Sequence, residues 1–373
     1  MLRPVMRPLW VLLSGLLLVA CVHPRSQEGL VVPVAPAASL TEQTAAAPEI
    51  KKTPVKIIAV GDIQLGRAWP REQQRLPDNP MQILGKVAPL LAGGDVVFGN
   101  LETVLADDGE SAKCQRPGKS CFAFRVPTEY AQALKQSGFN LLSNNNNHAR
   151  DFGEQGLAAT HNALSEQALA HSSDVAGVAY QHINGLSIAM VAYATGPEPY
   201  RLQQTEKAAA LVAELKQQND LVLVSFHGGA EGKTAQHVPK TIETYYGEDR
   251  GDVYAFAHAM VDAGADMILG HGPHVLRGME IYQGKLIAYS LGNFSAWETF
   301  NLQGASGISV ILSATVSPEG ELLAAKIIPL KVAWPGIPQF DDNEQGIELV
   351  NQLSQEDFSQ ALFTEAGEWN GQQ

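Results

Sequence analysis

The chain has 373 residues, of which 45% are hydrophobic, so it is long enough to bury the core of a globular domain. Its formal net charge of -13 argues against a general nucleic-acid-binding protein, and no nucleic acid is expected among its partners. An acidic chain can still accept an anionic substrate, because a bound metal ion reverses the local field.

The N-terminal residues are typical of an export signal. Arg3 and Arg7 precede an apolar run from Leu9 to Ala20, which is too short to span a membrane comfortably. Small residues lead to Cys21, and "LVAC" resembles a bacterial lipobox, whose cysteine becomes the lipidated first residue of the mature protein. We therefore predict a signal peptide over residues 1–20 and a lipid on Cys21; an ordinary secretory signal is the alternative. The predicted location is the cell envelope, and the outer membrane if the host is Gram-negative.

The other two cysteines also favour an exported protein. Cys114 and Cys121 close the short loop "CQRPGKSC", and such a pair in an oxidising compartment favours a disulfide. A zinc-binding pair is the competing interpretation. The chain has no second cysteine pair and the loop contains no histidine, so we predict the disulfide.

From Val55 onward, short apolar runs alternate with helical patterns. The runs expected to form buried strands are Val55–Val60, Asp95–Phe98, Phe139–Ser143, Leu221–Phe226 and Asp266–Gly270. Helical periodicity covers residues 128–138, 153–170, 205–219 and 251–264. A hairpin around "QGK" (283–285) and strands within 307–316 and 321–332 follow. This order predicts an α/β layered fold with at least one mixed sheet.

The predicted domain covers residues 55–335. Residues 21–54 are rich in Pro, Ala and Thr, which indicates a disordered tether between the lipid and the domain. Residues 336–373 are predicted to form a C-terminal helical extension. The apolar pattern of 346–363 predicts a helical hairpin packed on the domain.

Polar residues follow the predicted strands at the point where each strand ends. They are Asp62, then Asn100 and Glu102, then Asn147 and His148 at the end of "NNNNH", then His227, and finally His271 and His274 in "GHGPH". Each of them alone has an ordinary interpretation as a helix cap, a turn residue or a buried histidine. Because loops that leave the carboxyl ends of strands converge in open α/β sheets, we expect one shared site.

The chemistry of these side chains indicates a metal site. Asp, Glu, Asn and His supply oxygen and nitrogen ligands, which suit Mn, Zn or Fe better than a metal that prefers thiolates. Two ions held close together can activate a water molecule and bind the oxygens of a phosphoester. The sequence predicts one or two divalent ions.

Five blocks of the sequence resemble a known family. "AVGDIQLGR", "VVFGNLETVL", "NNHARDFGEQGL", "VSFHGGAEG" and "GADMILGHGPHVLRGMEIYQGKLIAYSLGNF" are similar to the signature blocks of the CapA family of capsule-synthesis (poly-gamma-glutamate biosynthesis) proteins. That family is similar in turn to the calcineurin-like metallophosphatases. The resemblance implies an α/β/β/α sandwich with two mixed sheets and a dimetal site.

The resemblance also implies roles for single residues. The metal ligands would be Asp62, Asn147, His227, His271 and His274, with Asn100 or Glu102 between the metals. His148 would protonate the leaving group. The sequence departs from the metallophosphatase pattern in three places. Gln64 stands where Asp-x-His has its histidine, and the second block offers Asn100 and Glu102 where the pattern has a metal-bridging Asp. His271 and His274 are one residue further apart than in Gly-His-x-His.

These observations lead to two functional hypotheses. The first is a lipid-anchored metallohydrolase acting on an anionic polymer or a phosphoester in capsule or exopolymer metabolism, with a phosphoester or a gamma-glutamyl amide as the bond cleaved. The second is a non-catalytic subunit that binds polymer or supports a membrane-bound exopolymer synthase. His237, Glu243, Glu248 and Arg250, in the insertion after His227, would shape a substrate pocket in either case, although a solvated loop is the simpler interpretation.

Overall fold

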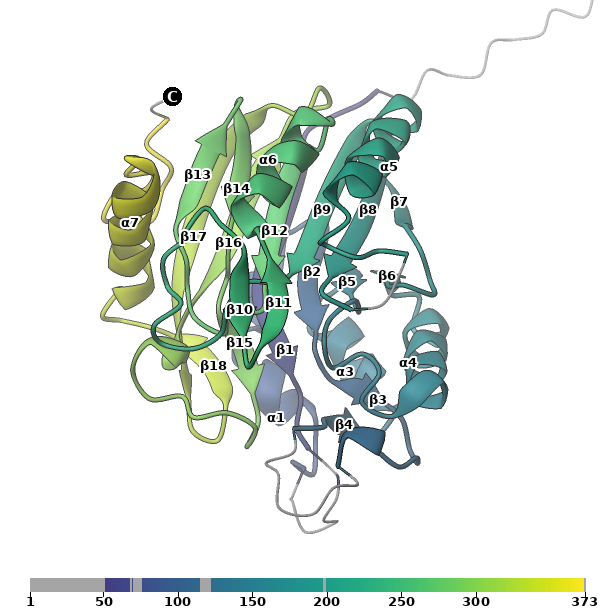
Figure 1. Ribbon diagram of the computed structural model, residues 1–373. Coiled ribbons are helices and arrows are strands. Elements are labelled where there is room, and N and C mark those ends of the chain that lie inside the picture. The colour runs from purple at the N-terminus through teal and green to yellow at the C-terminus, as the bar shows by residue number, and fades with distance from the viewer. Residues whose placement is uncertain (1–50, 68, 70–75, 115–121, 197–198, 372–373) are drawn as a thin grey trace, which may run out of the picture. The chain divides into compact units, whose positions relative to one another are not determined.

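Two β-sheets lie at the centre of the computed structural model (Figure 1). The structure describes residues 51–371 except 68, 70–75, 115–121 and 197–198, within a compact unit that covers Ile50–Gln373. The predicted signal peptide, Cys21, most of the tether and Cys121 lie outside the described residues. The lipid and the disulfide therefore stay predictions.

The first sheet has eight strands and is mixed. Its order is β18 (Ile337–Phe340), β17 (Leu322–Ala333), β16 (Ile308–Val316), β1 (Val55–Gln64), β2 (Val96–Leu101), β5 (Leu141–Ser143) and β6 (Ala170–Ser172), with β15 (Asn293–Ala296) also paired to β1. From β1 to β6 the pairs are parallel, and from β1 to β18 they are antiparallel.

The second sheet has six strands and is also mixed. Its order is β13 (Met279–Tyr282), β14 (Lys285–Ala288), β12 (Met267–His271), β9 (Leu221–His227), β8 (Leu186–Ala194) and β7 (Ala179–Ile183). Two small ribbons stand apart from both sheets: β3 (Val104–Leu105) with β4 (Arg125–Val126), and β10 (Glu243–Tyr245) with β11 (Glu248–Gly251). The turn between β13 and β14 is the hairpin predicted around "QGK".

Helices cover the outer faces of the two sheets (Figure 1). Those packed on the first sheet are α1 (Met81–Leu84), α2 (Ala88–Leu91), α3 (Tyr130–Gln136) and α4 (Gly153–Glu166). Those packed on the second are α5 (Thr205–Gln218) and α6 (Val253–Asp262). Single 3₁₀ turns lie at Ala112–Cys114 and Gly304–Gly307. The layers confirm the predicted α/β/β/α sandwich with two mixed sheets.

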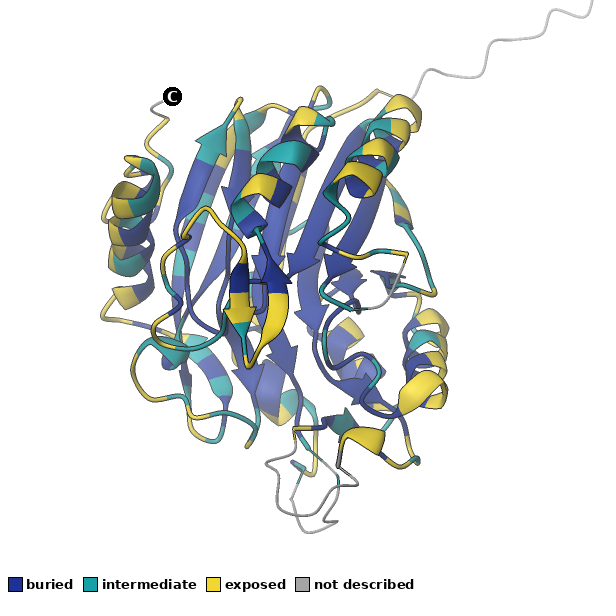
Figure 2. Ribbon diagram, viewed as in Figure 1, coloured by how far each residue is buried: buried dark blue, intermediate teal, exposed yellow. Residues whose placement is uncertain are grey.

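The alternation of side chains along each strand explains these layers. Ile57 and Ala59 of β1 belong to the core between the sheets, whereas Ile58 and Val60 face the helices of the first layer. Because successive strand residues point to opposite faces, an uninterrupted apolar run gives a strand that is buried on both faces. Figure 2 shows the central strands buried along most of their length.

The C-terminal residues differ from the predicted helical hairpin. Residues 345–358 form one helix, α7 (Gln345–Phe358), which contacts β13, β16 and β17, and β18 precedes it in the first sheet. Ser359 ends the helix in a left-handed conformation with φ of 59°. The side chain of Asn351 then pairs with both backbone groups of Phe363, which holds the following segment extended against the helix.

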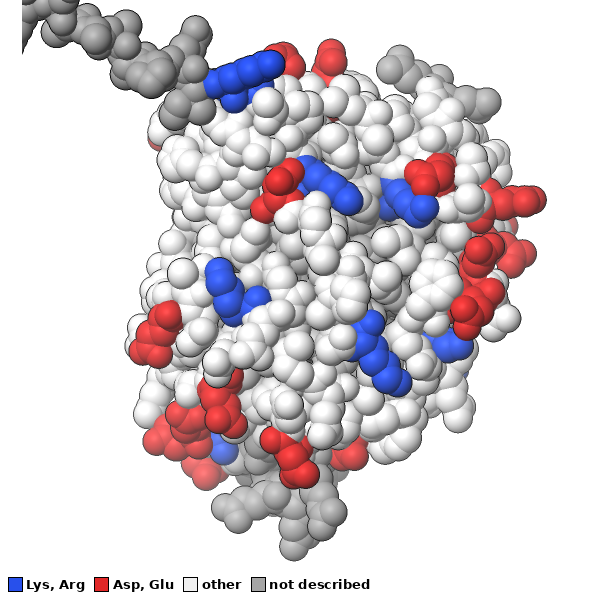
Figure 3. Space-filling view, turned by 180° about the vertical axis from the view of Figure 1, so that it is seen from behind, with Lys and Arg blue, Asp and Glu red and all other residues white. Residues whose placement is uncertain are grey.

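None of the helices in the described part of the chain is long and apolar enough to cross a membrane. On the face turned away from the viewer of Figure 1, the described Lys and Arg side chains stand singly, and acidic side chains gather toward two sides (Figure 3). The described residues of that face therefore form no continuous basic strip.

Candidate metal centre

The ends of strands from both sheets meet at one point. Parallel pairing places Asp62 of β1 beside Asn100 of β2, and His227 of β9 beside His271 of β12. The end of β1 carries a register shift between Ala59 and Asp62, and Asp62 N donates to Gly292 O over 2.9 Å. A Cβ on Gly61 would lie 2.0 Å from that same oxygen, so the close approach requires glycine here.

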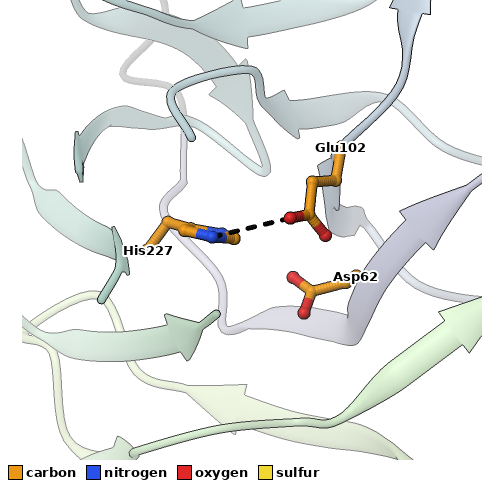
Figure 4. Close-up of side chains that lie close together, drawn as sticks. All are labelled: Asp62, Glu102 and His227. Atoms are coloured by element: carbon orange, nitrogen blue, oxygen red, sulfur yellow. Dashed lines mark ion pairs between the residues drawn. The ribbon is translucent and has the colours of Figure 1, made fainter. Parts of the chain in front are cut away.

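Three buried side chains form the centre of the site. Ligand atoms of Asp62, Glu102 and His227 all lie within 4.8 Å of one another, and the three side chains point toward one another (Figure 4). Both carboxylate oxygens of Glu102 and Nε2 of His227 are buried without a hydrogen-bond partner. Since buried carboxylates without partners are costly, this arrangement fits a divalent cation.

The environment changes the pKa values of these groups. Burial raises the pKa of Glu102 well above its usual value, against the opposing charge of His274. Burial lowers the pKa of His227 well below its usual value, which favours the neutral imidazole that a metal ligand requires. Burial would also raise the pKa of Asp62, but the hydrogen bond and charge of His274 outweigh it and lower the pKa.

His274 lies against both carboxylates. Its Nδ1 is 3.1 Å from Asp62 Oδ2, and its Nε2 is 3.6 Å from Glu102 Oε1. Burial would lower the pKa of His274, but the charge of Glu102 and the hydrogen bond to Asp62 raise it to about 10. A protonated imidazole thus balances the two carboxylates, which is the role that a bound cation would also fill.

Asn100 supports the ligands. Its amide nitrogen donates to Asp62 Oδ1 over 2.8 Å and lies 3.2 Å from Nδ1 of His227, while its oxygen accepts from the Asn146 amide over 3.1 Å. Of the two residues predicted between the metals, Glu102 directs free oxygens toward the other ligands. The geometry therefore favours Glu102 as the ligand and Asn100 as its support.

The four asparagines at 144–147 have two different roles. Asn144 and Asn146 each donate to Leu101 O, and Asn145 donates to Ala192 O over 2.8 Å. These three amides satisfy backbone carbonyls that the buried loop would otherwise leave unpaired. Asn147 lines the cavity described below, and its Oδ1 is buried without a hydrogen-bond partner, so that oxygen is available to a ligand.

His148 forms a pair with Asp151, a residue that the sequence motifs did not single out. His148 Nδ1 lies 2.7 Å from Asp151 Oδ2, which leaves Nε2 directed to the site, 3.9 Å from Glu102 Oε1. Asp151 also accepts hydrogen bonds from the backbone of Phe124 and from Lys113. Burial lowers the pKa of His148, opposed by the charge of Asp151. The His-x-x-Asp spacing was the signal in the sequence.

His271 and Gln64 lie at the edge of this group. His271 Nε2 is 3.1 Å from Val60 O, and its Nδ1 is 3.5 Å from Ser225 Oγ, so both ring nitrogens face core partners. Gln64 is buried, and its Oε1 accepts from Thr103 Oγ1 over 3.3 Å. The structure brings Asp62, Glu102, His227 and His274 together and does not bring His271 into that group.

A cavity of about 420 Å³ lies next to the centre, although Asp62, Glu102 and His227 do not line it. His148 and His274, which contact the carboxylates of the centre, line it together with Asn147. Lys113 and Phe122 line it from the segment before β4, Phe300 and Asn301 from the segment after β15, and Glu231, Tyr245, Tyr246, Glu248 and Arg250 from the insertion after β9.

The interpretation of this insertion as a solvated loop is wrong for Glu243 and Arg250, which are buried, whereas Glu248 is exposed. The β10–β11 ribbon is exposed at its tip and buried where it meets the body of the protein (Figure 2). Glu248 and Arg250 line the cavity, whereas His237 lies elsewhere and pairs with Asp357 over 2.8 Å. Glu243 is buried at the base of the ribbon by a two-fold ion pair with Arg277. This pair fixes the ribbon, because Arg–carboxylate forks have a defined geometry.

The family model for the bacterial capsule synthesis protein PGA_cap matches residues 56–296, which include the whole metal centre. The chain belongs to this family. The "Capsule biosynthesis protein CapA" of Bacillus anthracis is 30% identical over 266 residues, which are 68% of this chain and 62% of the relative. The "PGA biosynthesis protein CapA" of Bacillus subtilis is 31% identical over 63% of this chain and 61% of its own. The chain thus spans about three fifths of the curated relatives that it matches.

The PGA_cap match fits the resemblance expected from the sequence blocks. Among solved structures, a 5'-nucleotidase precursor from Thermus thermophilus is similar with a TM-score of 0.41 and 14% identity, over 77% of this chain and 54% of that one. A likeness of that size says nothing about the reaction of this PGA_cap protein.

Proposed function

We propose that this protein is a metal-dependent hydrolase of the bacterial cell envelope that acts on a capsule-type anionic polymer or on a precursor of it. The observation that carries the proposal is the buried group of Asp62, Glu102 and His227, whose unpartnered ligand atoms lie next to His148 and His274, two residues that line an open cavity. The three ligands themselves are buried, and the cavity reaches them through His148, Asn147 and His274, so a substrate in the cavity would lie beside the groups that contact the ligands.

Each residue of the site has a defined role in this proposal. Asp62, Glu102 and His227 would hold the cation, with Asn147 and His274 beside them. A divalent cation such as Mn, Zn or Fe supplies Lewis acidity when it is bound. His148 would give its Nε2 proton to the leaving group, and Asp151 orients the ring through Nδ1.

The substrate class is inferred from the family and from the site. The two Bacillus relatives carry names that refer to capsule and PGA biosynthesis. A poly-glutamate chain offers gamma-glutamyl amides for hydrolysis, and a phosphoester is the second bond that such a centre would cleave. Both substrates are anionic.

The non-catalytic subunit, which would bind polymer or support an exopolymer synthase, stays as the second candidate. It is favoured by Gln64, which replaces a histidine ligand of the metallophosphatase pattern, and by His271, whose ring nitrogens face Val60 and Ser225. The cavity with the His148–Asp151 pair favours the enzyme.

Turnover tests the proposal. We expect protein reconstituted with Mn, Zn or Fe to hydrolyse gamma-glutamyl oligomers or a phosphodiester reporter, with turnover that a chelator abolishes and the metal restores. Product release is measured by chromatography for the oligomers and by absorbance for the reporter. Stoichiometric metal without turnover on either class of substrate would favour the non-catalytic subunit.

The proposed envelope location includes a lipid on Cys21. In cells grown with a labelled fatty acid, we expect label on the wild-type chain and none on Cys21→Ser, which should leave the membrane fraction or remain as an unprocessed precursor. Cys114→Ser is the matched control and should keep the label. Equal labelling of wild type and Cys21→Ser would exclude the anchor.

A further inference from the structure

Two arginines are fully buried at the insertion after β9, and they differ in how they are paired. Arg277 donates from Nε to Ala235 O over 2.7 Å and from Nη1 and Nη2 to the two oxygens of Glu243 over 2.8 and 2.6 Å. All three nitrogens of its guanidinium are therefore satisfied inside the protein. Arg277 has a structural role.

Arg250 is buried to the same degree but is incompletely paired. Its side chain is 1% exposed, and Nε donates to Gly229 O over 3.0 Å. Nη2 lies 3.0 Å from Glu231 Oε1 without the geometry of a hydrogen bond. Arg250 and Glu231 both line the cavity next to the metal centre. A buried guanidinium with spare donors facing a cavity is a site for an acceptor.

The position of Arg250 is fixed by the backbone. Gly229 N donates to Arg250 O over 2.8 Å, which is the reciprocal of the bond from Arg250 Nε to Gly229 O. Gly229 has φ of 82°, and a Cβ there would lie 2.8 Å from Nη1 of Arg277. The "HGG" sequence after β9 thus places Arg250 and Arg277 side by side, so the guanidinium of Arg250 is oriented before any ligand arrives.

Lys113 is the second basic residue among those that line the cavity, and its ammonium group already has hydrogen-bond partners. Its Nζ bonds to Asn147 O over 2.7 Å and to the Asp151 carboxylate. Arg250 is also close to the centre, since Gly229, which exchanges hydrogen bonds with it, lies two residues after His227, and Arg250 lines the same cavity as His148 and His274. One anionic ligand can therefore contact the metal centre and Arg250 together. Tyr245 and Phe300 line the same cavity and reduce the water around it, which strengthens an ionic contact.

We propose that Arg250 binds an oxyanion of the substrate, a carboxylate or a phosphate, beside the bond that the metal centre cleaves, and that Glu231 competes with this oxyanion for the guanidinium. The assignment of the oxyanion to a substrate rests on the proposed function, whereas the oxyanion site itself does not. Arg250 is a specificity-determining residue in this account, because a planar guanidinium selects ligands with two acceptor oxygens.

Binding of two simple anions tests the site without turnover. Calorimetry on the metal-loaded protein would measure inorganic phosphate and glutarate, which represent the two sources of the oxyanion. We expect Arg250→Gln to weaken the preferred anion about 10- to 100-fold, as for the loss of a charge-assisted hydrogen bond. Arg250→Lys, which keeps the charge but not the fork, should fall between Gln and wild type. The exposed Arg201→Gln is the matched control and should bind as the wild type does.

Glu231→Gln gives a test with the opposite sign. Removing the competing carboxylate should tighten binding of the same anion, while the metal content stays unchanged. Unaltered affinity in a folded, metal-loaded Arg250→Gln, or weaker affinity in Glu231→Gln, would overturn the proposal. If Arg250→Gln loses its metal, Arg250→Lys and Glu231→Gln still decide the matter. Anion binding that depends on Arg250 without any hydrolysis would refute the hydrolase and keep this site. Hydrolysis with a KM independent of Arg250 would refute this site alone.

Discussion

Glu102→Gln is expected to lose the metal without losing the fold. Glu102 directs two free oxygens toward Asp62 and His227, so the substitution removes a ligand that Asn100 cannot replace from its place behind the site. Changes to residues that only support ligands cost about 10- to 100-fold in metal affinity, and a ligand should cost at least the upper figure. Metal titration followed by elemental analysis measures the effect.

Thermal unfolding gives an independent reading of the same substitution. A saturating ligand stabilises the folded state in proportion to the logarithm of its concentration over Kd, so a 100-fold loss of affinity removes about 2.7 kcal/mol of metal-dependent stability. Without metal, the buried and unpartnered carboxylate of Glu102 is a cost, and Glu102→Gln should melt at or above the wild-type temperature. Glu206→Gln, on the exposed side of α5, is the matched control. Wild-type metal affinity in Glu102→Gln would remove Glu102 from the ligand set.

His148→Asn is expected to keep the metal and lose turnover. His148 lines the cavity with Nε2 free for the substrate, while Asp151 holds Nδ1. Removing a positioned general acid costs roughly 100- to 10,000-fold in rate, and kcat should carry this loss because the proton moves in the transition state. Steady-state kinetics on the hydrolysed substrate, beside metal analysis of the same sample, measures both quantities.

His182→Asn, on the exposed part of β7, is the matched control and should have wild-type kinetics. The same pair of variants distinguishes the enzyme from the non-catalytic subunit in cells. Normal polymer yield from His148→Asn, together with loss of polymer from Glu102→Gln, would show that the metal is needed and proton donation is not. The hydrolase would then be rejected in favour of a metal-dependent subunit.

The sequence by itself determined the strands and the residues that follow them. Apolar runs such as Val55–Val60 and Leu221–Phe226 predict strands buried on both faces, because the alternation of side chains is a local property of the backbone. Polar residues directly after such runs, such as Asp62 and His227, then lie at the same edge of the sandwich for topological reasons. The α/β class and the position of the site follow from this pattern, whereas the family and the two-sheet sandwich were implied by the resemblance of five sequence blocks.

Only the tertiary structure decided which of these residues face one another. Asn100 and Glu102 are two residues apart and equally plausible as ligands in the sequence, but only Glu102 directs free oxygens toward His227 of the other sheet. His271 ends a strand as His227 does, yet its ring turns to Val60 O. A strand-end position fixes the location of a Cα atom, whereas ligation depends on the direction of the side chain and on competing partners.

The same reason explains why the sequence assigned no role to Asp151 and named Arg250 only as a pocket residue, without its anion-binding role. Asp151 orients His148 through its contact with Nδ1. Arg250 can bind an anion because its guanidinium lacks the complete set of hydrogen-bond partners that Arg277 has. The pairing of Asp151 with His148 is local, but the backbone of Phe124, 27 residues away, also holds Asp151, and Gly229, 21 residues away, holds Arg250. The His-x-x-Asp spacing was a local signal for the first pair, whereas tertiary packing alone creates the contacts with Phe124 and Gly229.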